Sequence, residues 1–340
     1  MLLGYELPEA GLTDPARFLV SSATKAEAAG VDFLVLGDRP AARPGGAGTP
    51  ASIIAASLLA VSTTHIGLVM NAALAYYEPY NLARMVASLD HIGKGRAGWQ
   101  VLTGPDGAAD ANHRREGVDP AAGRDARAAE FVPVVQDLWD TWEDGAFVHD
   151  KATGRFIDGE RIHALDHRGP ALQVRGPLNV VRPPQGRPVV LAPAADPLVA
   201  PAADVLTVGN PDSAAAAAPD AGGRPVLGVV TPFVAATGAL ARELHARAGS
   251  PESDEHSAVL VGDARQVAER LTAWADQGPV DGFILRFPLA EGVDAFTDAV
   301  LPLLGATRPE RATTLRGRFG LSKPANRIAD RVTAGTERGR

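Results

Sequence analysis

Eight short apolar runs are spaced along this chain, and most are separated by longer segments with the 3.6-residue period of amphipathic helices. Runs of this length, rich in Val, Ile and Leu, are typical of strands buried on both faces. Parallel strands need helical crossovers between them, so the alternation favours an α/β fold. The runs cover residues 2–7, 31–38, 65–75, 96–104, 188–192, 203–209, 224–235 and 281–287. Together they predict a single (β/α)8 TIM-like barrel.

The predicted helices place apolar residues three and four positions apart, which brings those residues to one face. They cover residues 14–30, 49–63, 78–93, 123–142, 237–249 and 263–278. In the fourth, Pro133 predicts a kink unless it falls in the first turn. The apolar face of that helix is expected to run as far as Trp142.

Residues 143–188 have the glycine, proline and charge density of loops, so we interpret them as an insertion after the fourth helix. Two short β-like pieces, 171–176 and 178–181, lie within it. We expect residues 1–330 to form one domain and residues 331–340 to form a flexible tail.

Composition excludes several function classes. The formal net charge of -7 leaves no basic surplus for binding nucleic acid or an anionic membrane surface. The chain has no cysteine, which excludes disulfides, thiolate nucleophiles and thiolate metal sites. No segment reaches about 18 uninterrupted apolar residues, and the N-terminus lacks the pattern of an export signal. We therefore expect a cytoplasmic protein that does not enter a membrane.

The connection after the fifth predicted strand is unusual for a parallel barrel. The stretch VVLAPAADPLVAPAADVL, residues 189–206, contains three prolines and two acids. A helix that starts here could hold a phosphate with its free N–H groups. Pro193 and Pro197 lack an N–H, and the connection is too short for an ordinary helix. We therefore expect no helix between these two strands.

Two histidines, His163 and His167, lie four residues apart in the insertion. They could be read as metal ligands, but no third ligand follows at a suggestive spacing. We expect them to pack on the substrate side or to lie at the surface, and we predict no metal site.

Three segments resemble the bacterial luciferase-like superfamily, in particular its nitrilotriacetate and dibenzothiophene-sulfone monooxygenases. They are SLDHIGKGRAGWQVLTG (88–104), residues 139–190 and TTLRGRFGLSKPANR (313–327), and the likeness extends from about Val31 to Arg327. The resemblance implies a TIM-like barrel with reduced FMN in its mouth, O2 as co-substrate and a small organic substrate. It also implies a separate flavin reductase and a homodimer.

The same resemblance indicates which residues would hold the flavin ring. Asp38 matches an acid that the family keeps at the end of its second strand, although an Asx turn in the following loop would also explain it. Asn71 stands where relatives have a threonine, and Gln100 where most have asparagine. Both amides can still donate and accept hydrogen bonds.

The phosphate end departs from the family pattern. Relatives begin the fourth helix with a histidine and a tyrosine, and the matching positions here are Ala121 and Asp125. Asp196 stands in place of a glycine- and serine-containing turn. These acids would repel a phosphate.

Arg124 and Arg127 flank the altered helix start. They could offset part of the repulsion, or they could pair with Asp125, Glu130 or other surface acids. On balance we expect FMN binding that is weak or lost.

Three functions remain open. The leading one is an FMN-dependent monooxygenase. The alternatives are a non-catalytic partner subunit or ligand-binding barrel without FMN, and an enzyme that uses the same barrel mouth without a flavin.

Overall fold

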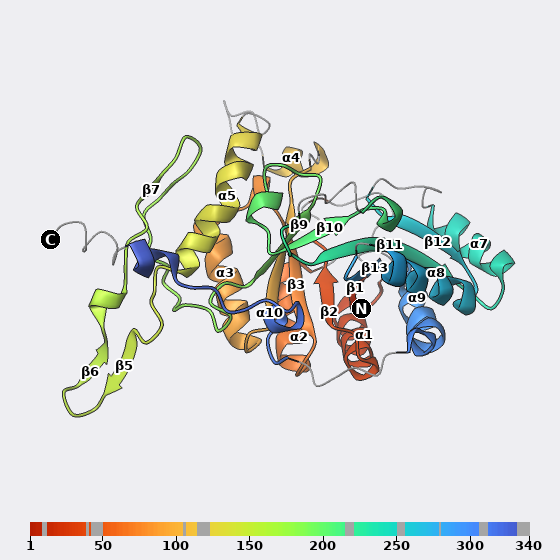
Figure 1. Cartoon of the computed structure of the whole chain (residues 1–340), viewed down its shortest axis with the longest axis horizontal. Helices are drawn as coiled ribbons and strands as arrows, with labels where there is room; N and C mark the ends of the chain where they lie inside the picture. The colour runs from red at the N-terminus through yellow and green to blue at the C-terminus, as the bar shows by residue number, and fades with distance from the viewer. Residues whose placement is uncertain are drawn as a thin grey trace.

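Eight parallel strands close into a barrel in the computed structural model of the chain (Figure 1). The barrel closes because β1 pairs with both β2 and β13, and β10 pairs with both β9 and β11. The predicted (β/α)8 fold is confirmed, and each of the eight predicted strands is present. In order around the barrel they are β1 (Leu2–Glu6), β2 (Phe33–Leu36), β3 (Gly67–Ala73), β4 (Ala97–Leu102), β9 (Val189–Pro193), β10 (Val205–Val208), β11 (Val226–Val234) and β13 (Gly282–Arg286).

The structure describes most of the chain. The described residues are 1–8, 12–38, 41, 50–104, 107–113, 123–214, 221–249, 256–278, 280–305 and 312–331. Among them, no helix has both the length and the apolar character needed to cross a membrane. The predicted tail lies almost wholly outside this part. The single domain over residues 1–330 and the homodimer stay predictions.

The six predicted helices are all present. They are α1 (Pro15–Ala29), α2 (Ser52–Ser62), α3 (Pro79–Ile92), α5 (Arg124–Trp139), α7 (Gly238–Ala248) and α8 (Ala264–Gln277). The structure adds the short helices α4 (Gly107–Asn112), α9 (Ala290–Ala295) and α10 (Leu315–Arg318), and a π-helix over Phe296–Val300. Pro133 lies inside α5 rather than in its first turn.

One further strand of the main sheet was not anticipated. β12 (Ala258–Gly262) pairs with the last five residues of β11, beyond the three residues of β11 that pair with β10. The run is five residues long and ends directly before Asp263, which caps α8. In the sequence, these five residues therefore look like the loop that leads into α8 rather than a separate strand.

Side chains alternate along the barrel strands between two apolar layers. Inward-facing residues such as Val69 and Leu191 fill the barrel, and outward-facing residues such as Leu68 and Val190 pack beneath the helices. This period of two is what parallel strands enclosed by helices require.

Residues 312–331 close the barrel at the amino ends of its strands. Leu315 and Phe319 both belong to the inward-facing apolar cluster. The Leu315 N–H donates to the Gly95 carbonyl just before β4 at 2.9 Å. The Phe319 ring lies 5.4 Å from that of Phe33, the first residue of β2. The carboxyl ends of the strands therefore form the mouth of the barrel.

The insertion follows α5, as predicted, and it carries two hairpins. They are β5 (Phe147–Asp150) with β6 (Arg155–Ile157), and β7 (His167–Arg168) with β8 (Gln173–Val174). Figure 1 shows the first hairpin projecting away from the barrel, whereas the second lies beside α5. The structure therefore places the first hairpin outside the barrel body.

Two local predictions in this region were wrong. Residues 178–181 form no strand, because their backbone bonds to side chains instead: Leu178 receives a hydrogen bond from Trp142 Nε1 and donates one to the Thr141 hydroxyl. Trp142 lies beyond the end of α5 and is half-buried, in a bridge to Ile162.

Candidate functional site

Charged side chains are nearly absent from the eight barrel strands, all of which lie in the described part of the chain. Glu6, the last residue of β1, and Arg286, the last residue of β13, are the only two. Four polar, uncharged residues occupy inward-facing positions on the strands. They are Asn71, Gln100, Thr207 and Thr231. Because the carboxyl ends of parallel strands meet at one end, these groups surround the barrel mouth.

Asn71 and Gln100 are paired in register on β3 and β4. Their residues are only 5% and 7% exposed, yet Asn71 Oδ1 and Gln100 Oε1 have no hydrogen-bond partner among the described residues. A buried polar atom without a partner costs about 1–3 kcal/mol. The structure thus brings these two predicted residues together, and their amides are available to a ligand.

Asp38 lies two residues after β2, and two donors among the described residues reach its carboxylate. Tyr77 Oη donates to Asp38 Oδ2 at 2.6 Å, and the backbone N–H of Ser52, at the start of α2, reaches Oδ1 at 3.5 Å. Burial, together with the neighbouring carboxylate, raises the pKa of the Tyr77 hydroxyl. Tyr77 therefore remains a donor at neutral pH. No pattern in the sequence pointed to this contact, because Tyr77 follows the turn Leu74–Tyr76 rather than a strand.

The connection after β9 contains no α-helix, as the prolines predicted. Turns lead to a single 3-10 turn, Ala200–Ala202, and then to β10. Asp196 is held within this connection: Oδ1 accepts from the Leu198 N–H at 3.0 Å, and Oδ2 accepts from Thr103 Oγ1 at 2.5 Å. The connection therefore offers a fixed carboxylate, and no helix N-terminus, to the mouth.

The two arginines at the start of α5 both contact acids, although Nε and Nη1 of Arg124 are buried without a hydrogen-bond partner among the described residues. Arg124 pairs with Asp110 at 3.2 Å. Arg127 donates to the Tyr77 carbonyl at 2.5 Å and pairs with Glu78 at 3.4 Å. Both arginines therefore form ion pairs with acids, as expected.

The partners named in the sequence differ from those observed. Asp125 is exposed on the first turn of α5 and has no described contact with either arginine. Glu130 instead receives the N–H groups of Ala171 and Leu172, which anchors the second hairpin of the insertion to α5. Ala121 lies outside the described residues.

His163 and His167 are each paired with an acid. His163 Nε2 lies 2.7 Å from Glu143, and His167 Nε2 lies 3.2 Å from Glu130. Among the described residues, no group of three or more His, Asp and Glu is placed to hold a metal ion.

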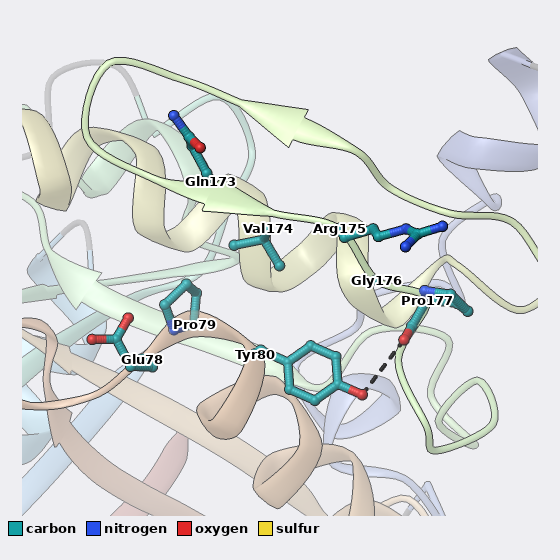
Figure 2. Close-up of a pocket in the computed structure, with 8 residues that line it drawn as sticks. All are labelled: Glu78, Pro79, Tyr80, Gln173, Val174, Arg175, Gly176 and Pro177. Atoms are coloured by element: carbon teal, nitrogen blue, oxygen red, sulfur yellow. Dashed lines mark hydrogen bonds between the residues drawn. The ribbon is translucent and has the colours of Figure 1, made fainter.

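The structure also contains an open cavity of about 410 Å³ outside the barrel (Figure 2). It lies between the start of α3 and the β7–β8 hairpin, where Tyr80 Oη donates to the Pro177 carbonyl at 3.5 Å. Its walls are Glu78, Pro79, Tyr80, Gln173, Val174, Arg175, Gly176 and Pro177. None of the mouth residues lines it, so it is separate from the candidate site.

Comparisons with known proteins agree with this geometry. The family model described as luciferase-like monooxygenase matches residues 2–222. N-acetyl-S-(2-succino)cysteine monooxygenase of Bacillus subtilis (strain 168) is 31% identical over 80% of this chain and 81% of its own length. One of the two pristinamycin IIA synthase subunits of Streptomyces pristinaespiralis is 36% identical over 89% of this chain and 88% of its own length.

Two further comparisons show sequence similarity over a shorter segment and similarity of the fold. Nitrilotriacetate monooxygenase component A of Aminobacter aminovorans is 51% identical over 42% of this chain and 31% of its own length. The structure of a riboflavin lyase with modified FMN and riboflavin superposes with a TM-score of 0.81 at 24% identity, covering 95% of this chain and 96% of that one. The second likeness concerns the fold alone.

Proposed function

Because the chain belongs to the luciferase-like monooxygenase family, we propose that it oxygenates a small organic substrate with O2 and reduced FMN supplied by a separate reductase. Two relatives are named as parts of larger systems, one as a component of a monooxygenase and one as a synthase subunit, which supports a system of several proteins. The names of two relatives denote carboxylic acids, N-acetyl-S-(2-succino)cysteine and nitrilotriacetate, which supports a substrate of that kind.

The observation that carries this proposal is the pair of buried amide oxygens, on Asn71 and Gln100, that have no partner among the described residues. The edge of a flavin ring presents both N–H donors and carbonyl acceptors, and an amide can serve either. Two adjacent amides, held on rigid strands and buried from water, can therefore hold and orient such a ring. The residues at this end of the site fit the flavin.

The connection after β9 does not fit the phosphate end of FMN. A phosphate needs backbone N–H groups, a helix N-terminus or cations. In this connection Pro193 and Pro197 lack an N–H, Asp196 presents a carboxylate, and no α-helix begins between β9 and β10. We infer that the flavin is held through its ring, and that FMN binds weakly for that reason.

Reduced flavin would supply the electrons for oxygen activation. The chain's own residues would have three tasks. Asn71 and Gln100 would orient the ring, and the hydrogen bond from Tyr77 would fix the carboxylate of Asp38 at the edge of the mouth. The inward-facing apolar residues, such as Val69 and Leu191, would exclude water from below.

The proposal leads to a direct comparison of two flavins. We expect FMN to bind no more than about threefold more tightly than riboflavin, because the phosphate adds little binding energy. Anaerobic fluorescence titration of the purified protein with each flavin, oxidised and reduced, measures the ratio. An affinity for FMN more than about tenfold above that for riboflavin would show that the protein binds the phosphate, contrary to the proposal.

Two variants serve as controls for this titration. Replacing Asn71 and Gln100 together with leucine should weaken both flavins about tenfold, whereas Gln173→Leu on the exposed hairpin should change neither. Asp196→Asn removes the charge and keeps one acceptor oxygen for the Leu198 N–H, while its NH2 group can donate to Thr103 Oγ1, and it should raise the affinity for FMN alone. If FMN gains nothing, the helix-free backbone rather than the charge causes the weak binding.

A non-catalytic partner subunit is the second candidate, and one observation favours it. The relative with 36% identity over 88% of its own length is itself one subunit of a synthase. Stopped-flow mixing of photoreduced FMN with air-saturated buffer distinguishes the two candidates. A monooxygenase component should change the rate of flavin reoxidation by itself, whereas a non-catalytic partner should leave the rate of the free flavin unchanged.

A further inference from the structure

Thr207, on β10, is a buried residue whose hydroxyl has no hydrogen-bond partner among the described residues. Only 6% of the residue is exposed, and it lies on the same face of its strand as Val205, which belongs to the inward-facing apolar cluster. A buried hydroxyl without a partner destabilises the fold, whereas a valine would fill nearly the same space without that cost. Packing therefore does not explain a threonine at this position.

The structure describes all eight barrel strands, and the other hydroxyl and charged side chains that face inward from them are bonded within the protein. On β11, Thr231 Oγ1 lies 2.8 Å from Ser257 Oγ, and both residues are buried. At the ends of β1 and β13, Arg286 Nε donates to Glu6 Oε2 at 3.0 Å. Thr207 therefore resembles the two amides of β3 and β4, whose oxygens are also buried without partners in the described part of the chain.

Thr207 belongs to the same layer of inward-facing side chains as Gln100. In a closed barrel of eight tilted parallel strands, each layer takes one side chain from every second strand. Starting at Gln100, we step across two strands along the register and forward by two residues, and repeat. Four such steps return to the starting residue, and the layer consists of Gln100, Thr207, Ile284 and Val35. Thr207 and Gln100 are therefore neighbours in one layer of the barrel.

Polar and apolar side chains occupy opposite halves of this layer. Gln100 and Thr207 follow one another in it, and the other two members, Ile284 and Val35, are apolar and fully buried. Asn71 pairs in register with Gln100 and belongs to the next layer toward the mouth. The three side chains with unused hydrogen-bonding groups therefore lie on one side of the barrel, on β3, β4 and β10.

Three such groups on one side match one edge of a flavin. The pyrimidine edge of the ring presents an N–H donor between two carbonyl acceptors, an amide can donate or accept, and a hydroxyl can do both. We propose that Thr207 binds the flavin ring together with Asn71 and Gln100, and that the ring enters the barrel with its pyrimidine edge foremost. Thr207 then donates to a ring carbonyl. This inference rests on the proposed function for the identity of the ligand.

The test uses lumiflavin, which is the flavin ring without a ribityl chain or phosphate, and 3-methyllumiflavin, in which a methyl group replaces the proton of that edge. Fluorescence titration of the purified chain should show that lumiflavin binds about tenfold or more tightly than 3-methyllumiflavin, because the methyl group removes the N–H and holds the edge away from the three side chains. Thr207→Val should weaken lumiflavin binding about fivefold. Thr207→Ser, which keeps the hydroxyl, should weaken it less than about twofold.

Thr231→Val is the matched control, since Thr231 is also a buried inward-facing threonine but its hydroxyl is bonded to Ser257. It should lower the midpoint of urea unfolding and leave lumiflavin binding unchanged. Thr207→Val should do the reverse, because its hydroxyl contributes no hydrogen bond to the fold.

Unchanged lumiflavin binding in Thr207→Val, or equal binding of the two lumiflavins by the original chain, overturns the inference. So does a loss of stability in Thr207→Val as large as that in Thr231→Val, since the hydroxyl would then have a structural role. In each of these cases the proposed function stands, because flavin is still bound. A chain that binds neither lumiflavin nor riboflavin would contradict the proposed function, and this inference with it.

Discussion

Replacing Arg96 with methionine is expected to lower the free energy of unfolding by about 3–5 kcal/mol. The residue is 4% exposed, and its guanidinium makes five hydrogen bonds. Nε donates to the Gly93 carbonyl at 2.8 Å; Nη1 donates to Thr63 Oγ1 and the Ile66 carbonyl; Nη2 donates to the carbonyls of Ala60 and Thr63. Methionine fills the space but leaves these acceptors buried without donors.

Urea unfolding, followed by circular dichroism, measures this loss as a lower midpoint. Arg155→Met is the matched control, because Arg155 is 54% exposed and pairs with Asp158 at the surface; we expect it to change stability by less than about 0.5 kcal/mol. Arg96→Lys should recover only a small part of the lost stability, since one ammonium group cannot reach both the Gly93 carbonyl and the acceptors in residues 60–66. A loss below about 1 kcal/mol for Arg96→Met would mean that water replaces the guanidinium there.

The second large effect is expected for Asp140→Ala, at about 3–5 kcal/mol. Asp140 is fully buried, and its carboxylate receives hydrogen bonds from Arg182 Nε at 3.1 Å, Arg187 Nη1 at 3.2 Å and the Arg327 N–H at 3.1 Å. Burial raises the pKa of Asp140, although both arginines act in the opposite direction. Burying these charges is therefore costly, but removing the acid leaves Arg187 without its ion-pair partner and Arg182 with only the exposed Asp144.

The three donors come from the end of the insertion and from the segment after α10, so this loss should loosen those segments first. Limited proteolysis should cut Asp140→Ala within residues 143–188 or 321–331 under conditions that spare the original chain. Asp150→Ala, in the turn of the projecting hairpin, is the control and should leave the barrel and the cleavage pattern of residues 321–331 unchanged. Wild-type resistance in Asp140→Ala would show that apolar packing alone holds these segments.

The sequence predicted the barrel well because its strands are apolar on both faces. Each of the eight runs became a barrel strand, since a run of Val, Ile and Leu bounded by turns has few other stable environments. One error lies where the chain bonds to side chains rather than to another strand. Residues 178–181 have strand-like composition, but the N–H and carbonyl of Leu178 bond to the side chains of Thr141 and Trp142.

The sequence predicted the candidate site less completely than it predicted the fold. Asn71 and Gln100 could be singled out by resemblance, and the structure brings them together. Glu6 and Arg286 carried a usable signal, a charge that ends an otherwise apolar run, but only the closed strand order reveals that they are neighbours. The contact of Tyr77 with Asp38 joins two loops, and no periodicity predicts a contact of that kind.

The barrel is sealed by a segment that follows all eight of its strands in the chain. Leu315 and Phe319 cover the amino ends of β2, β3 and β4 from a position about 30 residues after the last strand. During synthesis on the ribosome, the strands therefore emerge before the residues that cover their base. Until that cover arrives, the apolar interior stays open to water, and this interval is when the nascent chain is most exposed to aggregation and to chaperones.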